Sequence, residues 1–341
     1  MTNRLYILAA ALSAGVAGPA LIAGQVQAQE YEWQPDEPVT IIVPWAAGGS
    51  TDTVTRVLAN ELEQAIGQSF VVNNQPGASG SVGSRSVWEA DHDGMMIAAG
   101  AAADLGAYPV LDMLDVTLDE WRLYLHIANV SVISVHPDSE YEDFGDLMAA
   151  WEENPGEITV STAGVSSAGH IAISAIGSAA DIEYRHVTYD GGNPAVIAAV
   201  SGEVDVTSQL ASEQAEMIRG NRLKPLAVVA ARPLEIEGYG EIPSITDWLP
   251  DIEAANNYFG IFVPADAPEE VLNTLDRVWE EEIANSEALA EYAADSGAVF
   301  DPSYGEAAQE AVMPMLRINA CQLFEGGQAA NDPADFGIEC N

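Results

Sequence analysis

Short apolar runs alternate with amphipathic stretches along most of this chain. The clearest example begins at residues 39–43 (VTIIV), a run rich in β-branched residues that predicts a strand. After a loop of small residues, apolar side chains recur with a spacing of four, at Val54, Leu58, Leu62 and Ile66. This spacing predicts a helix with one buried face, which has its N-cap at Ser50 or Thr51 and ends just before Gly67.

The same alternation continues toward the C-terminus. We expect further strands at residues 69–73, 95–99, 130–136, 158–161, 184–188, 204–208, 225–230 and 258–264. We expect helices at residues 82–90, 144–151, 170–177, 193–200, 212–219 and 267–283, followed by a helical remainder. Strands and helices that alternate in this order indicate an α/β fold with a parallel sheet, and such sheets bind ligands at the carboxyl ends of their strands.

The length of 341 residues exceeds one ordinary hydrophobic core, so two lobes of about 100 to 150 residues are expected. Pro137 and Asp138 follow a predicted strand and mark a boundary, after which the theme of strand, small-residue loop and helix repeats. We assign residues 36–136 and 259–341 to a discontinuous first α/β lobe. Residues 137–258 form the second.

Residues 1–28 have the pattern of a secretory signal peptide. Arg4 provides a short positive region, residues 5–23 an apolar region, and residues 26–28 (VQA) a small-x-small cleavage pattern. An uncleaved membrane anchor is the alternative, but the many alanines and glycines make the segment only weakly apolar. We therefore expect cleavage before Gln29 and an exported mature protein.

The charge balance is strongly acidic, with 11 Lys and Arg against 53 Asp and Glu and a formal net charge of −42. Nucleic acids and anionic membrane surfaces are therefore poor partners. The hydrophobic content of 48% and the regular α/β pattern exclude a disordered acidic chain. Because the acids are dispersed and Lys224 is the only lysine, we expect adaptation to high salt, where a Debye length of about 3 Å at 1 M screens self-repulsion.

Two cysteines, Cys321 and Cys340, lie in the C-terminal tail. An oxidising compartment would let them pair across this short segment, so we expect a structural disulfide. No histidine separates them, which argues against a metal site. Paired ligand spacing is also missing from His92, His126, His136 and His186.

The loop between the first strand and helix is the best candidate for ligand chemistry. Gly48 and Gly49 carry no side chain that shields the backbone, so the first N–H groups of the helix are expected to be open to an anion, either carboxylate or phosphate. Residues 162–170 (TAGVSSAGH) repeat this arrangement in the second lobe. Two such helix starts, one in each lobe, predict a shared anion site.

Seven motifs occur in an order and spacing that resemble a known family. They are PVTIIVPWAAGGSTD, NNQPGASGSVGS, DHDG, STAGVSSAGHIA, HVTYDGG, SGEVDV and YFGIFVPADAPEEV. Together they make nearly all of the mature chain similar to the substrate-binding receptors of tripartite tricarboxylate transporters, the Bug-type periplasmic receptors. The resemblance implies a two-lobed, type II periplasmic-binding-protein-like fold that closes on a small organic carboxylate and delivers it to the transporter's membrane subunits. We expect a monomer without a cofactor.

The resemblance also implies the ligand-binding residues. Backbone N–H groups, hydroxyls and water, rather than arginine, are expected to hold the carboxylate. The first lobe would contribute Trp45, Ala46, Ala47, Gly48, Gly49, Ser50, Thr51 and Asp52, with Gly77, Ser79, Ala101 and Ala102 at neighbouring strand ends. The second would contribute Thr162, Ala163, Ser166, Ser167 and His170, with Tyr189, Gly191 and Gly192 closing the cleft.

Two departures from the family pattern affect the choice of ligand. Asp190 stands where relatives commonly carry lysine, and Thr188 stands where they commonly carry proline. The first departure removes a positive charge near the cleft, so a multiply charged anion such as citrate is less favoured. Arg185 is then the best placed cation for a second carboxylate, but acids are so plentiful in this chain that we expect a salt bridge there instead.

Several of these residues admit a second interpretation. Ser166 or Ser167 with His170 would supply a nucleophile and a base in an exported α/β hydrolase acting on esters, but neither serine lies in a complete Gly-x-Ser-x-Gly elbow. Trp45 fits a cleft wall and a core position equally well. For Asp52 we favour a helix-start acid that the helix dipole stabilises over a ligand contact, because a carboxylate would repel an anionic guest.

Overall fold

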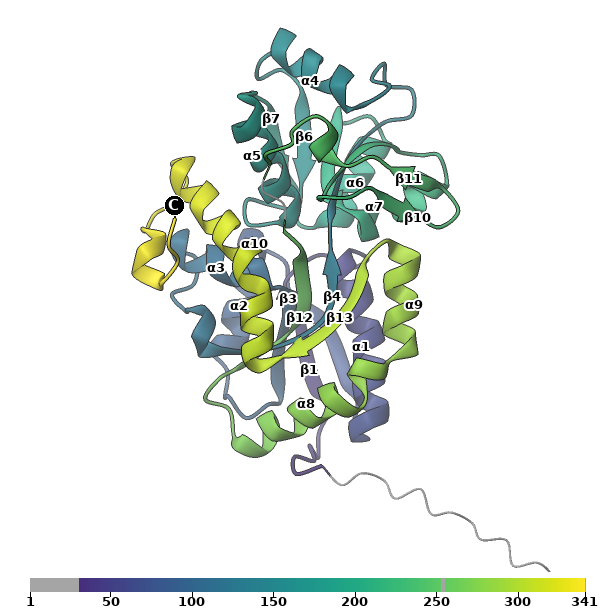
Figure 1. The fold of residues 1–341 in the computed structure, drawn as a ribbon. Helices are drawn as coiled ribbons and strands as arrows, with labels where there is room; N and C mark the ends of the chain where they lie inside the picture. The colour runs from purple at the N-terminus through teal and green to yellow at the C-terminus, as the bar shows by residue number, and fades with distance from the viewer. Residues whose placement is uncertain (1–30, 253–254, 341) are drawn as a thin grey trace, which may run out of the picture. The chain divides into compact units, whose positions relative to one another are not determined.

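The computed structural model describes residues 31–252 and 255–340, which belong to one compact unit that begins at Tyr31. The predicted signal peptide, residues 1–28, lies outside the described residues. Within the described unit, two separate sheets with flanking helices form two lobes, as Figure 1 shows. The α/β expectation is therefore correct.

The first lobe is built on a six-stranded sheet with the order β13-β4-β12-β3-β1-β2. Its strands are β1 (Val39–Val43), β2 (Phe70–Asn74), β3 (Met96–Ala101), β4 (Trp121–Asn129), β12 (Asn257–Pro264) and β13 (Val299–Tyr304). Its helices are α1 (Ser50–Ile66), α2 (Ser81–Trp88), α3 (Ala102–Val110), α8 (Glu269–Glu281), α9 (Glu287–Ser296) and α10 (Gly305–Glu325). Only β2, β1 and β3 run parallel, whereas β12 is antiparallel to β3 and β4. The predicted parallel sheet is thus a mixed sheet.

The second lobe is built on a five-stranded sheet with the order β7-β6-β8-β5-β9. Its strands are β5 (Ser131–Val135), β6 (Thr159–Thr162), β7 (Arg185–Thr188), β8 (Val206–Leu210) and β9 (Lys224–Val229), with a small hairpin of β10 (Leu234–Ile236) and β11 (Gly240–Ile242). Its helices are α4 (Phe144–Glu153), α5 (Ala168–Ala180), α6 (Gly192–Val200) and α7 (Ala211–Arg219). Here β5 is antiparallel to both β8 and β9, so this sheet is mixed as well.

The strand at 131–135 corrects the predicted boundary between the lobes. We placed it in the first lobe, with the boundary at Pro137, but β5 pairs with β8 and β9 of the second sheet. Only Val130 separates β4 of the first sheet from β5 of the second. The chain therefore crosses between the sheets near Val130, and it has returned to the first sheet by Asn257, where β12 begins.

Helix α1 begins one residue earlier than expected. Its N-cap is Gly49, with φ −77° and ψ 173°, rather than Ser50 or Thr51. The Gly49 carbonyl accepts a hydrogen bond from Thr53 N–H at 3.0 Å. Gly49 therefore makes the first backbone hydrogen bond of the helix, as an N-cap residue does, although it has no side chain to cap the free N–H groups. At the other end, Gly67 adopts the left-handed conformation (φ 82°) that a helix stop requires, as predicted.

Helix α10 joins the two lobes on one side of the molecule (Figure 1). It packs against α3 of the first lobe and α5 of the second. The Asn319 side chain donates to the carbonyl oxygens of Ala103, at 3.2 Å, and Ser166, at 3.3 Å. A disulfide joins Cys321 of α10 to Cys340, 19 residues later. Among the described residues, no helix combines the length and apolarity needed to cross a bilayer.

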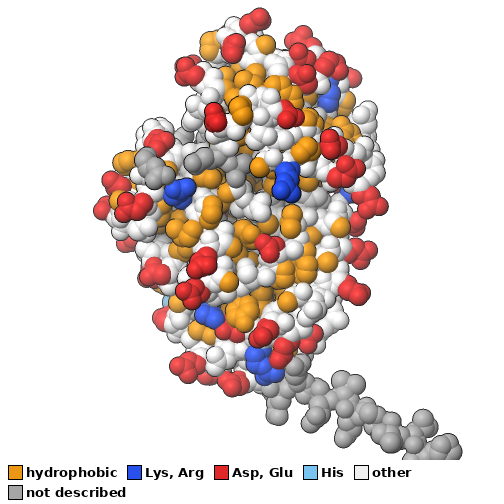
Figure 2. Space-filling view, viewed as in Figure 1, with side chains coloured by type: hydrophobic (Ala, Val, Ile, Leu, Met, Phe, Trp, Pro, Cys, Tyr) orange, Lys and Arg blue, Asp and Glu red, His pale blue; other side chains and the backbone are white. Residues whose placement is uncertain are grey.

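Acidic side chains are scattered across the visible face of both lobes rather than gathered in one patch (Figure 2). Most cations in the described part of the chain contact an acid, including Arg56, Arg85, Arg122, Arg219, Lys224 and Arg277. With 11 Lys and Arg against 53 acids, most carboxylates have no such partner. Long-range repulsion therefore remains for salt to screen.

Candidate functional site

The two lobes meet at a small cavity, called here the interlobe cavity. Its volume is about 30 Å³, which is space for one or two water molecules. Its lining consists of Trp45, Thr51, Ala101, Asp104, Ala163, Ser167, Ala168, Gly192, Gln209, Leu210, Glu213, Asn257 and Phe259. The sequence predicted Trp45, Thr51, Ala101, Ala163, Ser167 and Gly192 among these residues. The cleft is therefore closed and almost filled by the protein itself.

The loops of small residues contact each other directly across the lobes. Ala46 N–H donates to the Asp190 carbonyl at 3.1 Å, and the Ser50 and Ser212 hydroxyls lie 2.6 Å apart. Gly191 has a φ of 148°, and a Cβ there would lie 3.1 Å from Ala46 N. Because only glycine combines this backbone conformation with this approach, Gly191 lets the lobes meet.

A second set of contacts lies beside the first. Ser79, which has a φ of 52°, receives two hydrogen bonds from the second lobe. Its hydroxyl accepts from Val165 N–H at 3.2 Å, and its carbonyl accepts from the Ser166 hydroxyl at 2.9 Å. Ser79 and Ser166 therefore take part in lobe-to-lobe contact in the closed form, and neither lines the interlobe cavity.

Two of the N–H donors at the start of α1 are occupied, although we expected these donors to be open. Gly48 N–H donates to Asp52 Oδ2 at 2.9 Å, and Ser50 N–H donates to Glu213 Oε1 at 3.2 Å. Burial raises the pKa of Asp52, but hydrogen bonds with Arg56, Gly48 and Asn74 outweigh it and the net pKa is lowered. The chain's own carboxylates thus occupy two of the donors that were expected to receive a guest, and Asp52 serves as a helix-start acid.

Glu213, which the sequence analysis missed, comes from the first turn of α7 and reaches the starts of two other helices. Its carboxyl contacts Ser50 N–H of α1, and a Cβ on Gly192 of α6 would lie only 2.0 Å from its atoms. Burial raises its pKa to about 7, although hydrogen bonds from Ser50 and from Leu210, the N-cap of α7, lower it. An acid in a first helical turn is ordinarily interpreted as a partner of the helix dipole. The sequence therefore gave no sign that Glu213 contacts the other lobe.

Gln209 links Glu213 to the second small-residue loop. When its side-chain amide is oriented so that both ends are satisfied, its nitrogen donates to Glu213 Oε2 at 2.8 Å. Its oxygen then accepts from Ala163 N–H at 2.6 Å. The Glu213 carboxyl is therefore fixed by the second lobe as well as by Ser50.

Asp104 and Asn257 bring further polar atoms to the interlobe cavity from the first lobe. Asp104 is 3% exposed, and its Oδ1 has no hydrogen-bond partner among the described residues. Burial raises its pKa well above the ordinary value, although a hydrogen bond with the Trp45 side chain lowers it. Asn257 is 2% exposed, and both of its amide atoms lack a partner in the described part of the chain. Trp45, whose side chain contacts Asp104, is itself buried and also lines the cavity, so it is both a core residue and a part of the cavity wall.

Ser167 and His170 have structural contacts in this conformation. The Ser167 hydroxyl donates to the Gly164 carbonyl at 2.7 Å and accepts from His170 backbone N–H at 3.4 Å as the N-cap of α5. The His170 ring stacks on His186 at 4.4 Å, and burial lowers the pKa of His170. The hydroxyl and the ring of this predicted pair therefore have other partners, and the geometry of a nucleophile and its base is not formed.

The remaining predicted ligand-binding residues lie outside the interlobe cavity lining. Ala46, Ala47 and Gly48 are partly or largely exposed, whereas Ala102 is buried within α3. The Thr162 hydroxyl contacts His186 Nε2 at 2.6 Å. The Tyr189 hydroxyl donates to Glu203 at 3.0 Å, away from the cavity.

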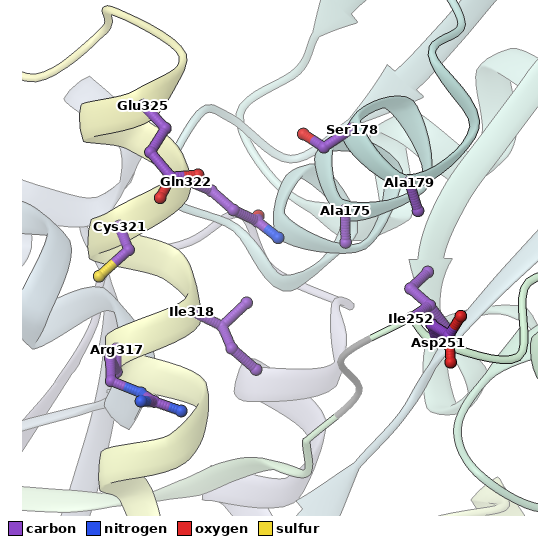
Figure 3. A pocket seen from close by; sticks show the side chains of 10 residues that line it. All are labelled: Ala175, Ser178, Ala179, Asp251, Ile252, Arg317, Ile318, Cys321, Gln322 and Glu325. Carbon is purple, nitrogen blue, oxygen red and sulfur yellow. The ribbon is translucent and has the colours of Figure 1, made fainter. Parts of the chain in front are cut away.

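A larger groove lies on the outside of the molecule between α5 and α10, and we call it the outer groove (Figure 3). Its volume is about 340 Å³, and it is lined by Ala175, Ser178, Ala179, Asp251, Ile252, Arg317, Ile318, Cys321, Gln322 and Glu325. None of the residues predicted to bind ligand lines it. Across the described residues, no group of three or more His, Cys, Asp or Glu side chains is arranged to hold a metal ion.

Comparison with known proteins agrees with this architecture. Residues 54–315 match the model of the tripartite tricarboxylate transporter family receptor. A protein encoded in the tcbD-tcbE intergenic region of Pseudomonas sp. strain P51 is 31% identical over 263 residues, which are 75% of this chain and 77% of that one.

Two solved structures share the fold. The periplasmic binding protein BugD is 23% identical, with a TM-score of 0.78 over 86% of this chain and 99% of that one. An R. palustris protein solved with adipate is 22% identical, with a TM-score of 0.77 over 86% and 98% of the two chains. The chain therefore belongs to the receptor family of tripartite tricarboxylate transporters, a family of two-lobed periplasmic solute-binding proteins.

Proposed function

We propose that this protein is an extracytoplasmic solute receptor, a monomer that binds a small organic carboxylate between its lobes and delivers it to the membrane subunits of a tripartite tricarboxylate-type transporter. The observation that carries the proposal is the meeting of two small-residue loops, each of which opens a helix, at one interlobe cavity. Family membership and the adipate complex of an R. palustris protein of the same fold support it.

Ligand entry requires the lobes to separate, because the interlobe cavity of about 30 Å³ is far too small for an organic acid. Opening also changes the chemistry of the site. Ser50 belongs to the first lobe, whereas Glu213 and Ser212 belong to the second. Separation therefore frees the Ser50 N–H and hydroxyl, which become available to an anion only in the open form, whereas Gly48 N–H keeps Asp52 of its own lobe as its partner.

Closure would then place the ligand between the two loops. The carboxylate would lie against the backbone from Gly48 to Thr51, and Ser167 of the second lobe would approach it. Because no arginine or lysine lines the interlobe cavity, backbone donors and hydroxyls must carry this recognition. Such donors recognise the carboxylate and leave the rest of the ligand to the shape of the cleft.

A thermal-shift screen of organic acids followed by calorimetry tests the proposal. We expect an acid that binds with one molecule per chain and is recovered unchanged. Release of a hydrolysis product from an ester would instead support the exported hydrolase and contradict a receptor without turnover.

A substitution at Gly49 locates the site. A Cβ there would lie 3.4 Å from Glu213 Oε1 and 3.6 Å from the Ala46 carbonyl, which are ordinary contacts, and its φ of −77° suits any residue. Gly49→Val should therefore fold while its side chain blocks the approach to the backbone. Gly177→Val in α5, whose nearest contacts are 3.4 and 3.7 Å, is the matched control and should bind normally. Normal binding by folded Gly49→Val would place the site elsewhere.

A further inference from the structure

Two acidic side chains, one from each lobe, line the interlobe cavity. Asp104 comes from α3 in the first lobe, and Glu213 comes from α7 in the second. No described arginine or lysine lies within ion-pair distance of either acid, and none lines the cavity. A buried carboxyl group without a cationic partner is costly to ionise, so both acids are suited to a positively charged group that arrives from outside.

Glu213 is held mainly by its own lobe. Leu210 and the reoriented amide of Gln209 both bind its carboxyl, and the missing side chain of Gly192 leaves it room. Among these contacts, only the hydrogen bond from Ser50 N–H comes from the first lobe. When the lobes separate, the second-lobe wall therefore still presents a carboxyl group in a fixed position.

Asp104 offers a matching acceptor from the first lobe. It is 3% exposed, yet its Oδ1 has no partner among the described residues. Asn257 lines the same cavity, and its Oδ1 is also unpartnered in the described part of the chain. Buried acceptors without donors cost free energy that a ligand with several N–H groups would recover.

We propose that the ligand carries a protonated nitrogen as well as a carboxylate, and that this nitrogen bridges Asp104 and Glu213 when the lobes close. The ligand class is then an amino acid or another small zwitterion. A dicarboxylate without nitrogen has no N–H group to offer the unpartnered acceptors of Asp104 and Asn257, and no positive charge to offset ionisation of the two acids. This inference rests on the proposed function, because it concerns the same interlobe site.

Pairs of acids that differ only in the nitrogen test the inference. Calorimetry in about 2 M NaCl would compare aspartate with succinate, glutamate with glutarate, and γ-aminobutyrate with butyrate on the wild-type protein. We expect at least one amino acid to bind at least about tenfold more tightly than its nitrogen-free partner. Equal or tighter binding of the nitrogen-free acids would overturn the inference.

Isosteric variants assign the preference to residues. Glu213→Gln and Asp104→Asn should each remove most of the preference for the amino acid, and they act from different lobes, so one remains informative if the other does not fold. Glu216→Gln and Asp115→Asn, at exposed acids near the same helices, should retain it. If Glu213→Gln instead tightens binding of the nitrogen-free acid, Glu213 competes with the ligand carboxylate and the inference is wrong.

The outcomes also separate this inference from the proposed function. If some nitrogen-free acid from the wider screen binds while all three amino acids fail, the receptor stands and the zwitterion is refuted. If no acid of either kind binds, both proposals fail.

Discussion

The substitution Glu213→Gln should change how stability depends on pH. Burial raises the pKa of Glu213 from 4.5 to about 7 in the folded protein. Between these pH values the folded chain keeps a proton that the unfolded chain releases, so the free energy of unfolding falls as pH rises through this window. Between about pH 5 and pH 8, this shift corresponds to about 2 to 3 kcal/mol. Glutamine does not titrate, so the variant should escape this loss.

Urea denaturation of the ligand-free protein, followed by tryptophan fluorescence in about 2 M NaCl, measures the effect. The stability of Glu213→Gln relative to wild type should increase by about 2 to 3 kcal/mol between pH 5 and pH 8. All other acids titrate in both proteins, so the comparison isolates Glu213. The control Glu216→Gln removes an acid whose side chain is 82% exposed and should change by less than about 0.5 kcal/mol. If the stability difference between Glu213→Gln and wild type stays constant with pH, or reverses, the reasoning is refuted. The N–H groups at the nearby helix starts would then stabilise the ionised carboxylate enough to cancel the effect of its burial on the pKa.

Four further outcomes are expected. Molar salt should raise the melting temperature substantially, because most of the 53 acids have no cationic partner; an unchanged melting temperature between dilute buffer and about 2 M NaCl would exclude salt adaptation. Exported protein should contain the Cys321–Cys340 disulfide, and its reduction should lower the free energy of unfolding by about 3 kcal/mol. Two free thiols in mass spectrometry of exported protein would contradict this prediction. Ser167→Ala should lose about 1 kcal/mol of stability, because Ser167 is the N-cap of α5, and it should bind the carboxylate several-fold more weakly. If denaturation and calorimetry both give wild-type values, Ser167 neither caps the helix to any effect nor contacts the ligand. Gly192→Ala should displace the Glu213 carboxyl, which is the end of a flexible side chain, and cost about 1 kcal/mol through its lost hydrogen bonds; unfolding equal to wild type would show that this carboxyl lies elsewhere.

Local features of the chain were predictable because nearby residues determine them. The strand, loop and helix from Val39 to Ile66 are found as expected, and Gly67 ends the helix in the left-handed conformation. In contrast, helix α3 was missed because Gly106 and Pro109 are residues that ordinarily interrupt helices. Tertiary packing explains Gly106, since a Cβ there would lie 2.2 Å from Leu316 Cγ of α10. The sequence around Gly106 contains no sign of that distant helix.

Strand pairing could not be read from local patterns either. β4 was missed because Arg122, His126 and Asn129 interrupt its apolar run, although His126 is fully buried. The strand at 131–135 was recognised but assigned to the wrong lobe, because an apolar run does not specify its partner strand. β13 was likewise included in a region that we expected to be helical.

The candidate site shows the same division between local and distant information. The two small-residue loops were found from their glycines and helix starts, and both contribute to the interlobe cavity. Glu213 was not found, because it occupies a first helical turn where an acid has a sufficient local explanation. Asp104 was not found, because its helix, α3, was itself missed. Only the arrangement of the two lobes shows that both acids reach one cavity.

A crystal structure with an acid identified by the screen tests the central claim most directly. The account predicts lobes that have closed around the acid, with its carboxylate against the backbone from Gly48 to Thr51 and the second lobe in contact through Ser167. An acid bound instead in the outer groove between α5 and α10, with the interlobe cavity still closed around Glu213, would contradict it.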